Sequence, residues 1–241
     1  MAQAIMAKSS QVDSRTNAGS NSKLALGLVL LWWAILALFY AVPELDIATS
    51  SIFFNNGFLA SQSPFLQWMR ETLYILPYTI GPAVLGWLLI RFLRGRGFST
   101  EQRTGLSMTL TLLFWPLLIV NGVFKEHWGR PRPRDTTLFG GEDPFVRAGE
   151  IADYCASNCS FISGEAASAG WLACLIMLVG KPWRLLAALA LVPASITMAG
   201  LRVAFGAHYL SDAALAYVGA IASFATISVL VEWLFASSRA K

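Results

Sequence analysis

The chain has 241 residues, of which 56% are hydrophobic and only 13% are charged. A soluble domain carries about 25% charged residues, so this composition excludes an ordinary soluble protein. The formal net charge of +4 comes from small clusters beside apolar segments, and this distribution does not indicate nucleic-acid binding.

Six apolar runs lie within residues 24–235, and each approaches or exceeds the ~20 residues that span hydrocarbon. The predicted fold is therefore all-α, a bundle of six transmembrane helices. The runs are Leu24–Val42, Leu73–Leu93, Leu106–Phe124, Phe161–Val179, Leu185–Leu201 and Tyr209–Phe235. The fourth and fifth runs are short and hold small or polar residues, so a buried helical hairpin is their alternative.

The segments outside these runs are polar. Residues 1–23 are rich in Ser, Asn, Gln and Ala, and we expect a disordered tail rather than a signal peptide. Residues 236–241 are predicted to form a second tail. Asp46–Phe65 is predicted to be an irregular external segment with a short interfacial helix.

Basic residues gather on alternate connections between the predicted helices. By the positive-inside rule, both chain ends and the second and fourth connections face the cytoplasm. The residues concerned are Lys8, Arg15, Lys23, Arg91, Arg94, Arg96, Arg103, Lys181, Arg184, Arg239 and Lys241. The other connections then face outward, which for a bacterial source means the periplasmic side of the inner membrane.

Two cysteines lie in the predicted external loop before the fourth run. Cys155 and Cys159 are four residues apart, and a disulfide between them would stiffen the approach to the fourth helix. Two free thiols are the alternative. A metal site is not expected, because no further cysteine or external histidine lies at ligand spacing.

The third connection begins with KEHWGRPRP, which holds Lys125 and Arg132. Lysine offers a mobile point charge, and arginine offers a planar fork that grips two phosphate oxygens. Pro131 and Pro133 restrict the backbone around Arg132. These cations predict a phosphate site, and a basic cluster at the lipid headgroups is the alternative.

The fourth run opens with Ser160-Phe161-Ile162-Ser163-Gly164-Glu165. A helix start presents free N–H groups and the positive end of the helix dipole, which suits a phosphate. Ser163 adds a hydroxyl, and Gly164 allows close approach. The alternative is an ordinary N-cap at Ser160 or Ser163.

The fifth connection holds Arg202, His208 and Asp212 in RVAFGAHYLSD. His208 and Asp212 are four residues apart and share one face of the helix that starts there. Asp212 is expected to accept the proton of one imidazole nitrogen and leave the other free to attack phosphorus. A histidine and an aspartate that cap a helix beside lipid headgroups are the alternative.

These segments together resemble the type 2 phosphatidic acid phosphatase family, which is related to the vanadium haloperoxidases. Its motifs are Lys-x6-Arg-Pro, Pro-Ser-Gly-His and Ser-Arg-x5-His-x3-Asp. The first is complete as Lys125 with Arg132-Pro133, and the third, from Leu201 to Asp212, lacks only its leading serine. The second reads Ile162-Ser163-Gly164-Glu165.

The resemblance implies a lipid phosphatase without metal or organic cofactor. Its site would lie at the membrane–water interface, on the side of the membrane that faces away from the cytoplasm. His208 would attack phosphorus and form a phosphohistidine, and Asp212 would orient it. The phosphoryl oxygens would be held by Lys125, Arg132, Ser163, the Gly164 amide and Arg202.

Glu165 is the main departure, because the family has its general-acid histidine at this position. Three readings are open: a protonated Glu165 replaces that acid, the substrate has a better leaving group, or the protein is weakly catalytic and binds or transfers phosphate. His127, the other histidine in the chain, is a conceivable substitute acid.

The expected substrate is an amphiphilic lipid phosphate. Candidates are phosphatidylglycerol phosphate, phosphatidic acid, undecaprenyl pyrophosphate and the phosphates of lipid A. The phrases NGVFKEHWGRPRPR and CASNCSFISGEAAS resemble the lipid A phosphatase branch of the family. A lipid phosphotransferase or a lipid-phosphate-binding protein on the same scaffold is the alternative function.

Overall fold

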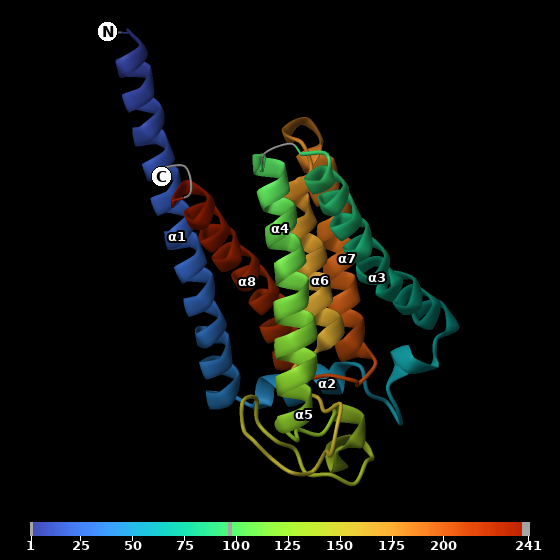
Figure 1. The fold of residues 1–241 in the computed structure, drawn as a ribbon. Helices are drawn as coiled ribbons and strands as arrows, with labels where there is room; N and C mark the ends of the chain where they lie inside the picture. The colour runs from blue at the N-terminus through green and yellow to red at the C-terminus, as the bar shows by residue number, and fades with distance from the viewer. Residues whose placement is uncertain (1, 96–97, 238–241) are drawn as a thin grey trace.

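The computed structural model of the protein describes residues 2–95 and 98–237 and is built from helices (Figure 1). The long helices are α1 (Ala2–Ala41), α3 (Pro64–Leu93), α4 (Thr100–Leu112), α6 (Gly164–Cys174), α7 (Arg184–Ala204) and α8 (Leu210–Ser237). The shorter elements are α2 (Glu44–Ile52), η1 (Leu59–Gln62), η2 (Leu113–Phe124), α5 (Lys125–His127), η3 (Pro133–Asp135), η4 (Thr137–Phe139), η5 (Leu175–Leu178) and η6 (Lys181–Trp183).

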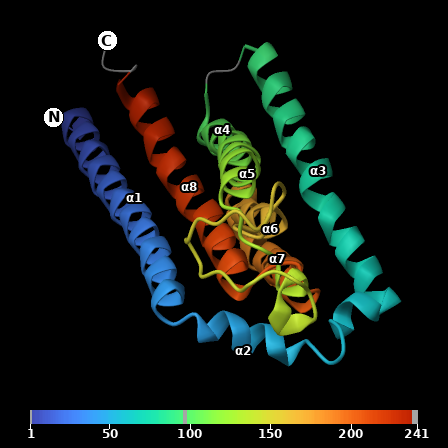
Figure 2. The ribbon, with the colours of Figure 1, turned by 90° about the horizontal axis from the view of Figure 1, so that it is seen from below.

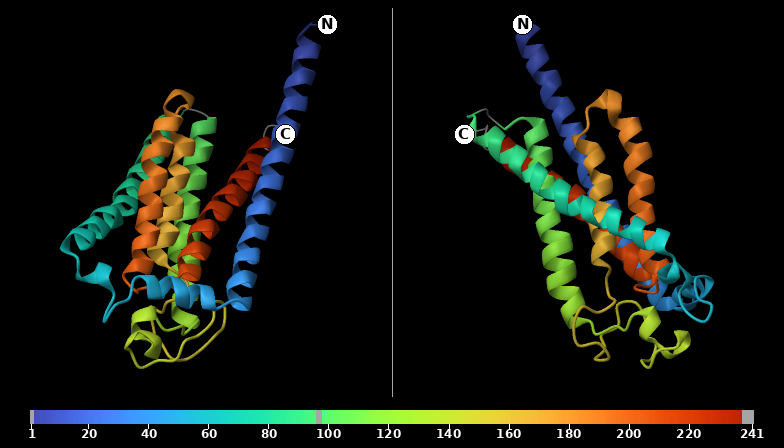
Figure 3. Two further views of the ribbon diagram at one scale, coloured as in Figure 1. Left: turned by 180° about the vertical axis from the view of Figure 1, so that it is seen from behind. Right: turned by 90° about the vertical axis from the view of Figure 1, so that its right-hand side faces the viewer.

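The bundle has two distinct ends. One end carries α2, α5 and the long connection 128–163, and both chain termini lie toward the other end (Figures 1 and 3). Seen from below, α2 lies across the loop end and leads from α1 toward α3 (Figure 2). The short helix predicted within Asp46–Phe65 corresponds to α2, which begins two residues earlier, at Glu44.

Among the residues that the structure describes, five helical segments are long and apolar enough to cross a membrane, so the protein is an integral membrane protein. They are Ser20–Ala41, Pro64–Leu93, Thr100–His127, Lys181–Ala204 and Leu210–Ser237. The predicted fourth span is shorter in the structure, with an apolar helix of only Gly164–Leu178. The prediction placed its start at Phe161, but residues 161–163 belong to the preceding loop.

The N-terminal tail predicted for residues 1–23 differs from the structure. From Ala2 onward these residues continue α1 as one helix. Extending an existing helix adds one hydrogen bond for each residue fixed, which is easier than starting a new helix. Of the predicted C-terminal tail, residues 236 and 237 belong to α8, and residues 238–241 lie outside the described residues.

The third span runs without a break through α4, η2 and α5. Pro116 lies inside it and has no N–H group to donate, and the helix is wider, with π-type hydrogen bonding, over Leu113–Phe124. The apolar segment ends at Lys125, which brings this cation to the loop end of the bundle. The predicted third run, Leu106–Phe124, stops at the residue before α5, whereas the observed span continues to His127.

The core lies around α6, which contacts α7 and α8 (Figure 1). Small residues allow α6 and α8 to pack closely, as is typical of membrane helices. A Cβ atom on Gly170 would lie 2.3 Å from the carbonyl oxygen of Tyr217, so only glycine fits there. This close packing brings the N-terminal ends of α6 and α8 together at the loop end.

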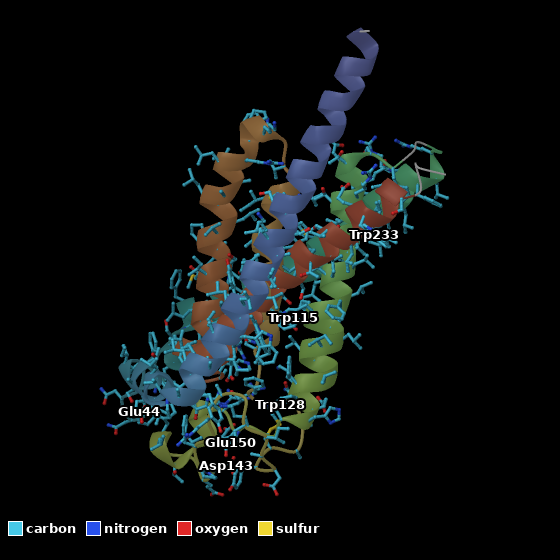
Figure 4. The ribbon with its side chains drawn as sticks, turned by 90° about the vertical axis from the view of Figure 1, so that its left-hand side faces the viewer. Glu44, Trp115, Trp128, Asp143, Glu150 and Trp233 are labelled. Atoms are coloured by element: carbon cyan, nitrogen blue, oxygen red, sulfur yellow. A yellow bond between two sulfur atoms is a disulfide. The ribbon has the colours of Figure 1, made fainter. Side chains whose placement is uncertain are left out.

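Side chains of the long connection are fixed against the loop end of the bundle. The labelled residues Glu44, Asp143 and Glu150 lie at the loop end, whereas Trp233 lies on the body of α8 (Figure 4). Trp128 donates a hydrogen bond from its indole to the carbonyl oxygen of Gly149 at 3.1 Å and stacks on Phe161. The long connection is thus tied to the segment that precedes α6.

Candidate functional site

The three sequence motifs meet where α5 and α7 end and where α6 and α8 begin. The backbone N–H of Ser163, the residue before α6, donates to the carbonyl oxygen of Asp212 in α8 at 3.2 Å. A short turn joins α7 to α8, and the carbonyl oxygen of Arg202 accepts from the N–H of His208 at 3.2 Å. The predicted residues are therefore brought together from separate parts of the chain.

The turn between α7 and α8 depends on Gly206. Its φ of +61° lies in the left-handed region that favours glycine. A Cβ atom there would also lie 2.3 Å from the ring of Phe58. The turn can thus reverse the chain tightly enough to place Arg202 and His208 at one site.

His208 is buried, with a side chain that is 1% exposed. Its Nδ1 lies 2.8 Å from the carbonyl oxygen of Ser160. A carbonyl oxygen only accepts, so we assign the imidazole proton to Nδ1. Nε2 then carries the free lone pair, which is the arrangement that a nucleophilic imidazole needs.

The predicted hydrogen bond between Asp212 and His208 is not formed. The nearest carboxylate oxygen, Oδ2 of Asp212, is 3.9 Å from Nδ1. It instead accepts from the hydroxyl of Ser160 at 2.5 Å and from the N–H of Tyr209 at 3.0 Å. The predicted shared helix face is not found, because α8 begins at Leu210 and His208 precedes it, and the loop residue Ser160 contacts both side chains.

Arg130 is fully buried and connects three segments through its guanidinium group. Nη1 donates to Asp212 Oδ1 at 2.6 Å and to the hydroxyl of Ser211 at 2.9 Å. Nη2 donates to Asp46 of α2 at 2.9 Å, and Nε donates to the carbonyl oxygen of Val146. Asp46 also accepts from the N–H and the hydroxyl of Ser211, so each buried charge is paired and hydrogen-bonded.

The charges around the imidazole favour its neutral form. Burial lowers the pKa of His208 well below its usual 6.5, and the positive charges of Arg202, Lys125 and Arg132 lower it further. The Ser160 carbonyl raises the pKa of His208 but does not outweigh these effects. At neutral pH the imidazole is uncharged, as an attack on phosphorus requires.

Asn158 holds the two cations of the first motif. Its side-chain oxygen accepts from Nζ of Lys125 at 2.8 Å, and its backbone carbonyl oxygen accepts from Nη2 of Arg132 at 2.7 Å. Asn158 has a φ of +51° inside the loop that the disulfide between Cys155 and Cys159 closes. The disulfide loop therefore orients Lys125 and Arg132.

Ser163 is the N-cap residue of α6, which agrees with the alternative interpretation of this motif. Its hydroxyl accepts from the N–H of Ala166 at 3.3 Å. Among the described residues, the N–H groups of Gly164 and Glu165 form no hydrogen bond. These amides remain able to bind an anion at the helix start.

Glu165 is engaged by two arginines. Arg70 of α3 donates to both of its carboxylate oxygens, from Nη2 at 2.6 Å and from Nε at 3.2 Å. Nη1 of Arg202 lies 3.3 Å from the same carboxylate. His127, the other candidate for the acid, is exposed at the end of α5, whereas the side chain of His208 is buried.

Five residues that orient the site were not anticipated from the sequence. They are Asp46, Arg70, Arg130, Asn158 and Ser160. Arg130 lies inside the spacer of the first motif, and Asn158 lies between the two cysteines. Both segments were recognised in the sequence, but neither residue was assigned a function. Asp46 and Arg70 both lie between the first two predicted apolar runs, in a segment without a recognised motif.

Comparison with known proteins gives a consistent result. The sequence profile of the PAP2 superfamily matches residues 104–239. Proteins named lipid A 4′-phosphatase from Rhizobium leguminosarum and Rhizobium etli are each 41% identical to the chain, over 222 and 231 residues. These matches cover 85% and 87% of this chain and 95% and 90% of those proteins.

Two more distant similarities agree with this. The lipid A 4′-phosphatase of Francisella tularensis subsp. novicida is 31% identical over 193 residues, which is 78% of this chain and 86% of that protein. The crystal structure of a PAP2-type phosphatidylglycerolphosphate phosphatase from Bacillus subtilis superposes with a TM-score of 0.55. It is 20% identical and covers 84% of this chain and 93% of that chain, so it supports the fold.

Proposed function

Since the chain belongs to the PAP2 superfamily of membrane lipid phosphatases, we propose that it hydrolyses a phosphate monoester of lipid A. The two Rhizobium relatives, each 41% identical to this chain, are named lipid A 4′-phosphatase, and they match most of it. Phosphatidylglycerol phosphate, phosphatidic acid and undecaprenyl pyrophosphate are the competing substrates. The shared names favour a phosphorylated glycolipid over these three.

The observation that carries the mechanism is the hydrogen bond between Nδ1 of His208 and the Ser160 carbonyl oxygen at 2.8 Å. It leaves Nε2 as the nucleophile. In the first step Nε2 forms a bond to phosphorus while the bond from phosphorus to the lipid oxygen breaks. The lipid oxygen leaves with the electron pair of that bond and gains a proton from water.

In the second step a water molecule attacks the phosphohistidine. A bond forms between the water oxygen and phosphorus, the bond from phosphorus to Nε2 breaks, and the proton that this water releases neutralises the hydroxide left by the first step. Inorganic phosphate is released, and His208 returns to its neutral state. One water is consumed for each lipid phosphate, and the reaction as proposed uses no metal ion or organic cofactor.

Positive charge is arranged to stabilise the phosphoryl group in both steps. Lys125 and Arg132 come from one side, held by Asn158. Arg202 comes from α7, and within the described residues its buried Nε has no hydrogen-bond partner. The amides of Gly164 and Glu165 add N–H donors at the start of α6, so the site offers both charge and directional hydrogen bonds.

We further propose that the site faces the periplasm in a bacterial inner membrane. The basic connections counted by the positive-inside rule lie at the end opposite the site. The disulfide between Cys155 and Cys159 is at the site's end of the bundle, and disulfides persist in the periplasm. Both described ends of the chain would then be cytoplasmic.

The test is release of inorganic phosphate from lipid A, phosphatidylglycerol phosphate, phosphatidic acid and undecaprenyl pyrophosphate by the detergent-purified protein. We expect lipid A to be hydrolysed fastest, and His208→Ala to lower the rate at least 1,000-fold, in line with losses seen for catalytic nucleophiles. His127→Ala is the matched control, because this exposed histidine is outside the proposed machinery. A His208→Ala variant as active as the parent would rule out the phosphohistidine route.

A further inference from the structure

Glu165 joins two arginines that come from different helices. Arg70 projects from α3 and Arg202 from α7, and both lie within ion-pair distance of Oε1 of Glu165, at 2.6 and 3.3 Å. The side chains of Glu165 and Arg202 are 12% and 9% exposed, while that of Arg70 is 33% exposed. The cluster therefore runs from the buried site toward its rim.

Two guanidinium groups close together repel each other, and this repulsion is stronger away from bulk water. A carboxylate between them offsets it. Arg202 also gains an ion-pair partner in this way, while its buried Nε is left without a hydrogen bond among the described residues. Glu165 thus fixes the position of a cation that still has a donor for a ligand.

The hydrogen bonds of Glu165 are not those of a proton donor. Both carboxylate oxygens accept N–H groups of Arg70, at 2.6 and 3.2 Å. A proton on either oxygen would oppose one of these donors and end a charge-assisted hydrogen bond. The arrangement therefore suits an ionised carboxylate that holds arginine.

Arg70 keeps donor capacity for a ligand. Its contact with Glu165 uses Nε and Nη2, and in the described part of the chain no acceptor is bonded to Nη1. The ring of Tyr74 lies 5.9 Å from the guanidinium carbon and supports it from one side. A phosphate approaching from the rim would meet a guanidinium that is already oriented.

We propose that Glu165 is a positioning residue for Arg70 and Arg202, and that Arg70 is a further phosphate-binding residue of this site. The proposal rests on the proposed function, because it assigns roles in the same phosphate site. It replaces the expectation that Glu165 acts as the general acid. The site would then bind the phosphate with four cations, from α3, α5, the long connection and α7.

The test is a double-mutant cycle on lipid A hydrolysis with Arg70→Ala, Glu165→Gln and the double variant. We expect each single change to lower kcat/KM about 10- to 100-fold, the usual range for hydrogen bonds to charged groups. We expect the double variant to lose clearly less than the product of the two single losses, because Glu165 acts in part through Arg70 and in part through Arg202. Losses that multiply would overturn the proposal.

Inhibition by inorganic phosphate tests the binding role directly. Arg70→Ala should raise the inhibition constant of phosphate at least fivefold, and Arg70→Lys should restore part of the affinity. An unchanged inhibition constant would overturn the binding role of Arg70. Thermal unfolding in detergent, together with Arg70→Lys and Glu165→Asp, separates loss of binding from loss of folding.

The pH profile separates positioning from acid catalysis. If Glu165 positions arginines, Glu165→Gln lowers kcat by a constant factor from pH 5 to 7 and leaves the shape of the profile over that range unchanged. If it donates a proton, the parent loses activity as pH rises and Glu165→Gln does not, which would overturn the proposal. A parent that hydrolyses no lipid phosphate would instead contradict the proposed function itself.

The matched control lies on the same helix. Arg91 is near the far end of α3, pairs with Glu101 at 3.7 Å, and its side chain is 33% exposed, as is that of Arg70. Arg91→Ala should change kcat/KM and the phosphate inhibition constant by less than twofold. An equal effect from Arg91→Ala would mean that Arg70 acts through the helix rather than through phosphate.

Discussion

Nη1 of Arg130 lies 2.6 Å from Oδ1 of Asp212, and both side chains are completely buried. The other carboxylate oxygen of Asp212 accepts a hydrogen bond from the Ser160 hydroxyl, and the Ser160 carbonyl oxygen accepts one from His208. The nucleophile is therefore connected to Arg130 through two intermediate residues. Asp46 extends this connection to α2 at the loop end.

Removing Arg130 should be severely destabilising. Arg130→Met leaves two buried carboxylates without their cation, and breaking a buried ion pair costs about 3–5 kcal/mol. The same carboxylates outweigh burial and raise the pKa of Arg130, so the guanidinium stays charged. Thermal or denaturant unfolding in detergent would measure this loss.

Arg134→Ala is the control for that experiment, because Arg134 belongs to the same loop and its side chain is 53% exposed. We expect it to change the free energy of unfolding by less than about 0.5 kcal/mol, as is usual for surface positions. Equal stability of the two variants would show that the Asp46–Arg130–Asp212 contacts do not stabilise the fold.

Ser160 should transmit the effect of Asp212 to the nucleophile. Ser160→Ala removes the hydroxyl that donates to Asp212 but keeps the carbonyl oxygen that accepts from His208. We expect a fall in kcat of about 10-fold with little change in KM, because the imidazole loses orientation rather than charge. Steady-state kinetics on lipid A would measure the split, and a fall confined to KM would contradict it.

Asn158 should control phosphate affinity through Lys125 and Arg132. Asn158→Gly keeps the positive φ accessible and removes the amide that accepts from Lys125. We expect KM to rise about 3- to 10-fold, because one of the two cations loses its orientation. Asn56→Gly is the matched control, since Asn56 also has a positive φ, of +50°, in another loop.

The local parts of this structure were predictable, and the long-range contacts were not. Apolar length predicted five of the six spans, and motif spacing predicted that Arg202, His208 and Asp212 lie close together, because they are near one another in the sequence. Arg70 and Glu165 are 95 residues apart, and Arg130 and Asp46 are 84 apart. No periodicity in a single sequence relates such residues, because their contact depends on how α2, α3 and the long connection pack at one end.

The predicted Asp212–His208 hydrogen bond is wrong for the same reason. Helical spacing predicted that the two residues share one face of a helix, but α8 begins at Leu210 and His208 precedes it. The spacing contained no information on Ser160, which enters from the long connection and satisfies both partners. A carboxylate near an imidazole predicts a contact only when nothing else competes for their hydrogen bonds.

His208 should remain neutral well below pH 6.5. Burial and the charges of Arg202, Lys125 and Arg132 lower its pKa, so the protonated form appears only at a pH far under the usual midpoint. Because the neutral imidazole is the nucleophile, protonation of His208 should not reduce kcat/KM near pH 6.5. Removing a neighbouring cation reverses part of this effect, so Arg132→Ala should move the titration of His208 to higher pH.

The chain has two histidines, which makes a direct measurement feasible. In protein labelled with ¹⁵N-histidine, His127→Ala leaves His208 as the one imidazole signal in detergent micelles. We expect a protonated Nδ1 and an unprotonated Nε2 throughout the range above pH 6.5, because Nδ1 donates to the Ser160 carbonyl oxygen. Titration of His208 at or above pH 6.5, or a proton on Nε2, would contradict the arrangement that leaves Nε2 free to attack phosphorus.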